Sequence, residues 1–216
     1  MRSLKPALLA RSLVASVPLA SAALAVALAM PPAAAYAQAS DPAALQIDSF
    51  NHTLLEAMKG GKSLGFQGRF RKLEPAVTRT FNLPVMIRFA TGPAWTTLAP
   101  ADQSALLTAF TRYSVSTWAK NFDSYHGQKF EMGAVETRGP DKLVHTKLVS
   151  TDGSSVDLTY RMREAGGDWK VIDVYFNGAI SQLSQQRADY AATLQNGGAK
   201  ALVRKIDDLS DKAARG

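Results

Sequence analysis

Apolar residues recur along this chain with two different periods, and the change of period separates helical parts from a strand-rich part. Between residues 41 and 122 the apolar side chains return every three or four positions, which is the spacing of amphipathic helices. The clearest helix spans 100–122, where Leu106, Phe110 and Trp118 share one face. Three shorter helices are predicted before it, over 41–60, 67–80 and 84–92.

Turn and cap residues mark where these helices begin and end. Asp41 followed by Pro42 predicts an N-cap with proline at the first helical position, and Gly60-Gly61 predicts the end of that helix. Pro75 is expected to kink or restart the second helix. Near the C-terminus a helix is expected from Gly178 to the Asn196-Gly197-Gly198 sequence, and a last one over 199–209.

A period of two replaces the helical spacing between these parts and predicts four strands. One set of alternating side chains, Val156, Leu158, Tyr160 and Met162, predicts a sheet with one covered face and one wet face. Consecutive hairpins give an antiparallel meander, so the fold class is α+β: a curved four-strand sheet with helices on its concave face, similar to NTF2 and cystatin folds, enclosing an apolar cavity. The strands span 129–137, 142–150, 155–163 and 169–176, joined by Gly139-Pro140-Asp141, Asp152-Gly153 and Ala165-Gly166-Gly167-Asp168.

The first 37 residues have the three-part layout of a secretory signal peptide. A basic start with Arg2 and Lys5 precedes an uncharged apolar run over 13–30, and Ala35-Tyr36-Ala37 supplies the small residues that a signal peptidase needs. The alternative is a membrane anchor, but the run is near the lower limit of ~17–25 residues for a span. We expect cleavage after Ala37, with Ala39 as the alternative end, and one soluble exported domain over 38–216.

The charge of the mature chain excludes several classes of function. Without Arg2, Lys5 and Arg11 the chain keeps 22 basic and 18 acidic residues, a net charge of +4, and no Lys/Arg cluster alternates with aromatic residues. Nucleic acid is therefore not an expected partner. The chain has no cysteine, which excludes disulfides and thiolate metal sites. No metal and no cofactor are expected.

Residues with catalytic potential are few. His52, His126 and His145 fall in different elements without metal-ligand spacing, and no nucleophile elbow or phosphate-binding glycine loop occurs. Asp173 stands in an apolar strand, where a buried carboxyl with a raised pKa can act as a base in an enzyme of NTF2-like fold. The preferred interpretation is a structural ion pair between Asp173 and Arg187, with no catalytic residue.

An ordered set of motifs resembles the MlaC and toluene-tolerance family. Its C-terminal part is the WKVIDV strand, 169–174, which leads through Gly178 into a helix bearing Arg187 and Tyr190. Upstream, the LPVM sequence at 83–86 precedes the GPAW sequence at 92–95. Within the family the chain is most similar to the HpnM branch, which is associated with hopanoid lipids. The motifs for this are FxxRFxxL at 66–73, PVMxRxAxG at 84–92 and DVYxxG at 173–178.

The resemblance implies a monomeric periplasmic carrier that shuttles phospholipid or hopanoid between the inner and outer membranes. Its implied partners are an inner-membrane lipid transporter complex and an outer-membrane lipid donor or acceptor. The four cations Arg69, Arg71, Lys72 and Arg88 are expected on a solvated helix face, with an anionic headgroup as the alternative contact. The residues expected to line the lipid cavity are Phe81, Met86, Phe89, Trp95, Phe110, Trp118, Val144, Leu148, Leu158, Tyr160, Met162, Ile172 and Val174.

Overall fold

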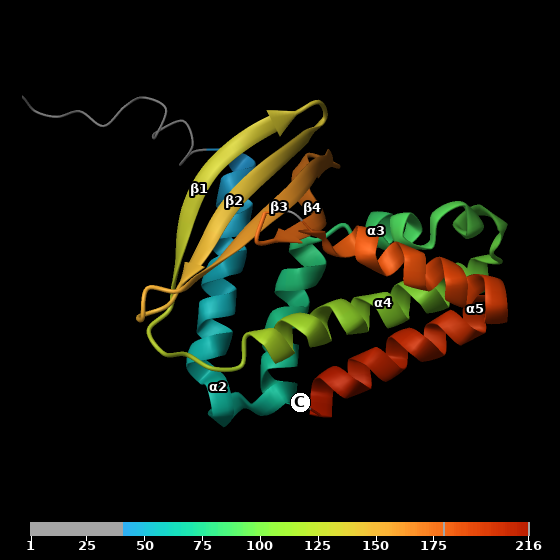
Figure 1. Cartoon of the computed structure of the whole chain (residues 1–216), viewed down its shortest axis with the longest axis horizontal. Helices are drawn as coiled ribbons and strands as arrows, with labels where there is room; N and C mark the ends of the chain where they lie inside the picture. Colours follow the sequence, from blue (N-terminus) through green and yellow to red (C-terminus); the bar gives the residue numbers. More distant parts are fainter. Residues whose placement is uncertain (1–40, 179, 216) are drawn as a thin grey trace, which may run out of the picture. The chain divides into compact units, whose positions relative to one another are not determined.

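The computed structural model describes residues 41–178 and 180–215, which all lie in the unit Pro32–Gly216. The predicted signal peptide lies outside the described residues. Figure 1 shows a strongly twisted sheet with α2 lying along one of its faces. The predicted α+β class is therefore confirmed.

The sheet is an antiparallel meander, as the hairpin signals predict. Each strand pairs with the next along the chain, and the residues Val144, Tyr160 and Val174 stand side by side across three strands. A two-residue strand at the edge is the one addition to the predicted set within the described residues. The strands are β1 (Lys129–Arg138), β2 (Asp141–Val149), β3 (Ser155–Ala165), β4 (Asp168–Phe176) and β5 (Ile180–Ser181).

On the covered face of β3 the alternation predicts the burial correctly, except at the start of the strand. Leu158, Tyr160 and Met162 are buried, whereas Val156 is 39% exposed. The prediction for Val156 is wrong because this residue stands beside the β2–β3 turn, where the sheet ends.

A β-bulge changes which residues of β4 face the helices. Arg161 pairs with Asp173 but Met162 pairs with Val171, so Ile172 is one extra residue on β4. Val171 and Val174 therefore both lie on the buried helix side. Strict alternation along the strand predicts that Ile172 and Val174 face the same side of the sheet. The bulge breaks this alternation, so they face opposite sides.

Five helical segments complete the fold of the described residues, and glycines break the two longest of them. The predicted stop at Gly60-Gly61 is a change of direction inside α2, where Gly61 (φ 36°) and Gly65 (φ 58°) leave helical geometry. The predicted break near Gly198 (φ 67°) is present in α5. The segments are α2 (Pro42–Thr80), α3 (Leu83–Thr91), the 3-10 helix η1 (Gly92–Thr97), α4 (Pro100–Asn121) and α5 (Gln182–Arg215).

Two local predictions on α2 have opposite outcomes. Asp41 is the N-cap, since its Oδ1 accepts a hydrogen bond of 2.9 Å from the N–H of Ala43. Pro75 does not interrupt the helix, because the backbone stays helical through it. Pro75 is exposed, so water can replace the hydrogen bond that a proline cannot donate.

A buried arginine ties the bend of α2 to α4. Arg69 is 7% exposed, donates from Nε to the carbonyl of Ala119 (2.8 Å) and from Nη1 to the carbonyl of Gly61 (2.9 Å). The expectation that Arg69 lies on a solvated face, or meets a headgroup, is therefore wrong. Arg71, Lys72 and Arg88 are exposed, as expected.

The core is centred on aromatic rings from three elements and from Phe81, between α2 and α3. Phe50 of α2 lies 5.1 Å from Trp118 of α4 and 5.2 Å from Phe81, measured between ring centroids. Trp118 also stacks on Tyr160 of β3 at 6.5 Å. Phe81 follows α2 and bridges to Val171 of β4, where the N–H of Asn82 donates to the carbonyl of Val171. This cluster joins the helices to the covered face of the sheet.

Removing Arg69 tests the tie between the α2 bend and α4. We expect Arg69→Met to lower the free energy of unfolding by about 3 kcal/mol, because two buried carbonyls lose a charged donor. Urea unfolding of the purified protein measures it. The matched control Arg71→Met, on the exposed side of the same helix, should stay within about 0.5 kcal/mol of wild type. Equal losses in both variants would contradict the assigned role.

Candidate functional site

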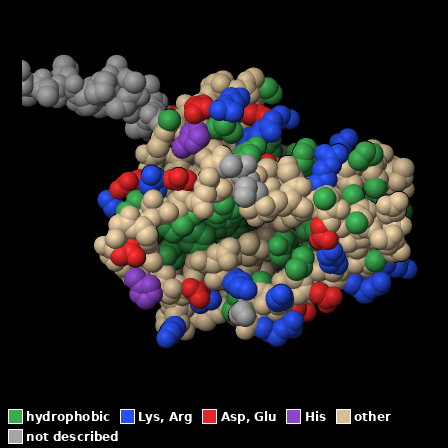
Figure 2. All heavy atoms as spheres, in the orientation of Figure 1, with side chains coloured by type: hydrophobic (Ala, Val, Ile, Leu, Met, Phe, Trp, Pro, Cys, Tyr) green, Lys and Arg blue, Asp and Glu red, His purple; other side chains and the backbone are tan. Residues whose placement is uncertain are grey.

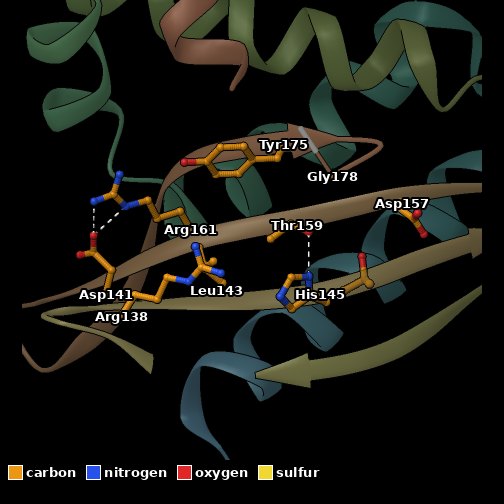
Figure 3. Close-up of a pocket in the computed structure, with 10 residues that line it drawn as sticks. Arg138, Asp141, Leu143, His145, Asp157, Thr159, Arg161, Tyr175 and Gly178 are labelled. Atoms are coloured by element: carbon orange, nitrogen blue, oxygen red, sulfur yellow. Dashed lines mark hydrogen bonds and ion pairs between the residues drawn. The ribbon is translucent and has the colours of Figure 1, made fainter. Parts of the chain in front are cut away.

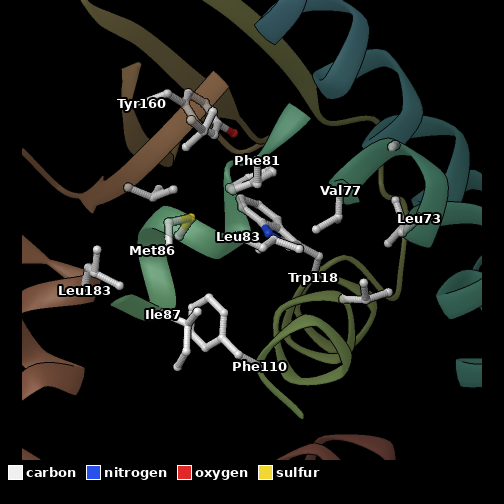
Figure 4. Close-up of a cluster of buried hydrophobic side chains, with 14 of the residues drawn as sticks. Leu73, Val77, Phe81, Leu83, Met86, Ile87, Phe110, Trp118, Tyr160 and Leu183 are labelled. Carbon is white, nitrogen blue, oxygen red and sulfur yellow. The ribbon is translucent and has the colours of Figure 1, made fainter. Parts of the chain in front are cut away.

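An apolar pocket lies between α3, α4, β4 and the start of α5. Its cavity volume is about 80 Å³. Figure 4 shows the side chains of Met86 from α3, Phe110 and Trp118 from α4, and Leu183 from α5, together with Phe81, which lies between α2 and α3. The pocket is lined by Phe81, Met86, Phe110, Tyr113, Ser114, Thr117, Trp118, Asn121, Val174, Phe176, Gln182, Leu183 and Gln186.

One face of α4 supplies nearly half of these residues. Phe110, Ser114, Thr117 and Asn121 follow at spacings of three and four, which places them on one side of the helix. Ser114 and Thr117 donate their hydroxyls to backbone carbonyls four residues earlier, Phe110 and Tyr113. Their polar atoms are thus satisfied within the helix, and their aliphatic atoms are left for the pocket.

The deep end of the pocket is rigid and aromatic. Phe81 and Trp118 contact each other with ring centroids 5.7 Å apart, and both also contact the buried Phe50. Met86 adds a flexible thioether beside these rings, a side chain that adapts to ligands of different shape.

The opening of the pocket is polar but uncharged. Asn121 of α4 and Gln182 and Gln186 of α5 line it, and their side chains make no hydrogen bond with the rest of the described chain. They can therefore rotate without loss of an internal bond. Figure 2 shows a hollow with hydrophobic side chains at its bottom, between the sheet and α4.

The residues predicted to line a cavity divide into three groups. Phe81, Met86, Phe110, Trp118 and Val174 line the pocket. A second group, Val144, Leu158, Tyr160 and Met162, is buried solid core, and Leu148 and Trp95 are half-buried against that core. The third group lies elsewhere, since Phe89 is 44% exposed and Ile172 faces the opposite side of β4 because of the bulge.

Several lining residues were not predicted from the sequence. Tyr113 belongs to the predicted apolar face of the long helix. Its spacing from Phe110 and Asn121 was therefore sufficient to predict it as a lining residue. The sequence gives no such signal for Gln182 and Gln186. A glutamine at a pocket opening has the same spacing along a helix as a glutamine on a solvent-exposed face. The complete set is Tyr113, Ser114, Thr117, Asn121, Phe176, Gln182, Leu183 and Gln186.

Asp173 has different partners from the Arg187 that the sequence suggested. Its Oδ1 accepts from the N–H groups of Val174 (2.8 Å) and Leu183 (3.3 Å), and its Oδ2 accepts from the hydroxyl of Ser181 (2.6 Å). Arg187 instead lies over the ring of Phe89, 5.0 Å from the centroid. Asp173 thus fixes the start of α5 to β4 and makes no ion pair with Arg187.

The opposite face of the sheet carries a polar trough of about 560 Å³ (Figure 3). His145 bridges two strands there, with Nδ1 3.0 Å from the hydroxyl of Thr159 and Nε2 3.2 Å from a carboxylate oxygen of Glu136. The histidine is half-buried on the wet face, as predicted. Among the described residues, no group of three histidine or acidic side chains could hold a metal ion.

A buried carboxylate at one end of this trough holds two arginines. Asp141 is 2% exposed and accepts from Nε of Arg161 (2.6 Å) and from Nε (2.6 Å) and Nη2 (3.0 Å) of Arg163. Burial by itself raises the pKa of Asp141. The hydrogen bonds and charges of Arg163 and Arg161 outweigh burial and hold the pKa below its ordinary value.

A family model described as MlaC protein matches residues 48–208, most of the chain and all of the elements that build the pocket. The chain belongs to the MlaC family. This family consists of lipid-binding carriers and not of enzymes.

A solved structure supports the same fold for this MlaC-family chain. It is the phospholipid-binding protein from Ralstonia solanacearum in complex with a phospholipid, with a TM-score of 0.71 and 19% sequence identity. The alignment covers 81% of this chain and 99% of the other. MlaC proteins are periplasmic. Of the helices in the described part of this chain, none has both the length and the apolar character needed to cross a bilayer.

The Asp141 cluster predicts a pH dependence of stability. Because the folded-state pKa of Asp141 lies below its unfolded value of about 3.9, its contribution is complete above that value and is lost as the pH falls through the folded-state pKa. We expect Asp141→Asn to cost about 2 kcal/mol at pH 7, with the difference from wild type shrinking as the pH falls below the unfolded-state pKa of about 3.9. Urea unfolding across the range from neutral pH to below that value measures both curves. The exposed Asp157→Asn serves as control, and a pH-independent gap would refute this assignment.

Proposed function

We propose that this protein is a lipid carrier that holds lipid tails in the pocket between α3, α4, β4 and α5. The observation that carries the proposal is an aromatic and aliphatic pocket with an uncharged opening whose side chains are free to move. The similar Ralstonia protein was solved with a phospholipid bound, which supports phospholipid as the class of ligand.

The energetics of lipid transfer explain why such a pocket is useful. Moving an acyl chain into water costs about 0.8 kcal/mol per CH₂, on the order of 10 kcal/mol per chain. A dry pocket removes most of that cost without any covalent step. The present volume of about 80 Å³ is well below the ~300–1,000 Å³ of typical ligand pockets. Loading therefore requires the pocket to widen, and the unbonded side chains of Asn121, Gln182 and Gln186 allow this at the opening.

The proposal extends to the place of the carrier in the cell. We propose a periplasmic monomer, formed by residues 38–216 after cleavage of the signal peptide near Ala37. It would move phospholipid between an outer-membrane donor or acceptor and an inner-membrane transporter complex. The HpnM-like motifs around Phe66–Leu73 and Pro84–Gly92 support a hopanoid as an alternative ligand. Because a hopanoid is a rigid ring system, it would need a wider pocket than an acyl chain.

Blocking the pocket tests the carrier function directly. Ser114 lines the pocket and Ser104 is exposed on the same helix, so the two serines form a matched pair. We expect Ser114→Trp to weaken lipid binding about tenfold, since forcing extra volume into a packed site costs about 1–3 kcal/mol. Ser104→Trp should bind lipid as wild type does. The measurement is the lipid-bound fraction, by native mass spectrometry, of protein exported from a bacterial host.

Two outcomes would refute the proposal. Wild-type protein that carries no lipid and takes none from vesicles would exclude a carrier. Equal lipid binding by both tryptophan variants would place the ligand outside this pocket. Extracting the bound lipid, and offering delipidated protein vesicles with phosphatidylglycerol or with a hopanoid, distinguishes the two ligand classes.

A further inference from the structure

A small groove lies beside the apolar pocket, on the other side of Leu183. Its volume is about 140 Å³. The groove combines exposed apolar side chains of α3 with the arginines of β3. The apolar pocket between α3, α4, β4 and α5, called the tail pocket below, has no charged side chain in its lining. Its lining residues are Val85, Phe89, Arg161, Arg163, Ile172, Asp173 and Leu183.

The arginines of this groove are held in place but keep free donors. A guanidinium has five N–H groups. Arg163 uses two of them on Asp141, and Arg161 uses two on Asp141 and one toward Tyr175. At least two N–H groups remain on each arginine. Because Asp141 fixes both side chains, an anion that binds here loses little of its binding energy to ordering them.

A third cation stands beside the groove. Arg187 lies over the ring of Phe89, which lines the groove, and has no carboxylate partner among the described residues. Gly92 makes room for it, because a Cβ at this position would lie 3.3 Å from Nη2 of Arg187. With φ of 64°, position 92 also favours glycine for its backbone conformation.

Asp173, which lines the groove, and Asp141, which binds the two arginines of its lining, are already satisfied. Both oxygens of Asp173 accept hydrogen bonds, from two backbone N–H groups and the Ser181 hydroxyl, and both oxygens of Asp141 face the arginines. The three arginines outnumber the two carboxylates, so the groove and its edge carry a net positive charge. A small anion is the matching ligand.

The size of the groove indicates one group rather than a whole small molecule. A water molecule takes about 30 Å³ in the liquid, so 140 Å³ accommodates a few oxygen atoms around a central atom. Arginine forks match the geometry of phosphate oxygens. A phosphate group therefore fits both the charge and the volume.

A thin wall separates the groove from the tail pocket. Leu183 lines both. On β4 the neighbours Val174 and Asp173 face the pocket and the groove respectively, and on α3 Met86 faces the pocket while Val85 faces the groove. Displacing the side chain of Leu183 would connect the two spaces, with apolar atoms on one side and arginines on the other.

We infer that this groove is a phosphate subsite, which binds the headgroup phosphate of a lipid whose tails occupy the pocket beyond Leu183. The inference rests on the proposed carrier function and assigns the headgroup contact that the uncharged opening does not supply. Phosphate can also come from a free anion, so the test compares the two sources.

The test uses two lipids that differ only in the phosphate, dihexanoyl phosphatidic acid and dihexanoylglycerol. Binding of each to the purified exported protein is measured by calorimetry. We expect the phosphatidic acid to bind about tenfold more tightly, because its phosphate oxygens accept charge-assisted hydrogen bonds from the arginines. Arg163→Gln should remove this preference, Arg187→Gln should reduce it, and Arg163→Lys should retain part of it. Affinity for dihexanoylglycerol should not change in any variant.

Two controls show whether the phosphate preference comes from this groove and from a bound lipid. Arg71→Gln makes the same charge change at an exposed position outside the groove and should leave both affinities unchanged. Inorganic phosphate should bind far more weakly than phosphatidic acid, and equal binding of these two would overturn the link to the lipid pocket. Equal binding of both lipids to wild type would overturn the subsite alone. Failure of both lipids to bind would instead overturn the proposed carrier function.

Discussion

The contact of Trp118 with Phe50 and Phe81 is the interaction on which the arrangement of this fold depends. It brings α4, α2 and the segment that enters α3 together over the covered face of the sheet, where Tyr160 closes the cluster from β3. Phe81 and Trp118 also form the deep end of the apolar pocket. The pocket is therefore continuous with the hydrophobic core, and its deep end is formed by core residues. Any widening of the opening would therefore leave the aromatic base of the pocket in place.

The bulge in β4 gives the two sides of this strand different chemistry. By adding Ile172, it keeps Val171 and Val174 on the buried side and places Asp173 opposite Arg161 on the other. Asp173 then holds the start of α5 through the N–H of Leu183 and the hydroxyl of Ser181. One irregular residue thus determines where the apolar pocket ends and where the groove with arginines begins. The separation matters for a lipid, whose tails and headgroup need opposite surroundings.

The sequence predicted the sheet well and the pocket only in part, for identifiable physical reasons. Alternation and short turn sequences depend on local geometry, so the hairpins around Gly153 and Gly166 could be predicted directly. Leu158 and Val174 have the same pattern, yet one is solid core and the other lines the pocket, because that difference depends on how closely the helices approach. The roles of Arg69 and Asp173 depend on partners from other segments, which spacing along the chain does not reveal.

The small volume of the pocket is favourable for the stability of the fold. An apolar cavity costs about 24 cal/mol per Å³, so an empty void of ~300 Å³, the lower end of typical ligand pockets, would cost about 7 kcal/mol. That is a large share of the ~5–15 kcal/mol by which most domains are stable. By the same figure the present 80 Å³ costs about 2 kcal/mol. An unloaded carrier therefore gains by contracting its pocket, and lipid must supply the contacts that hold it open. An opening whose Gln182 and Gln186 side chains make no hydrogen bond with the described chain, set against a packed aromatic base, suits such an exchange.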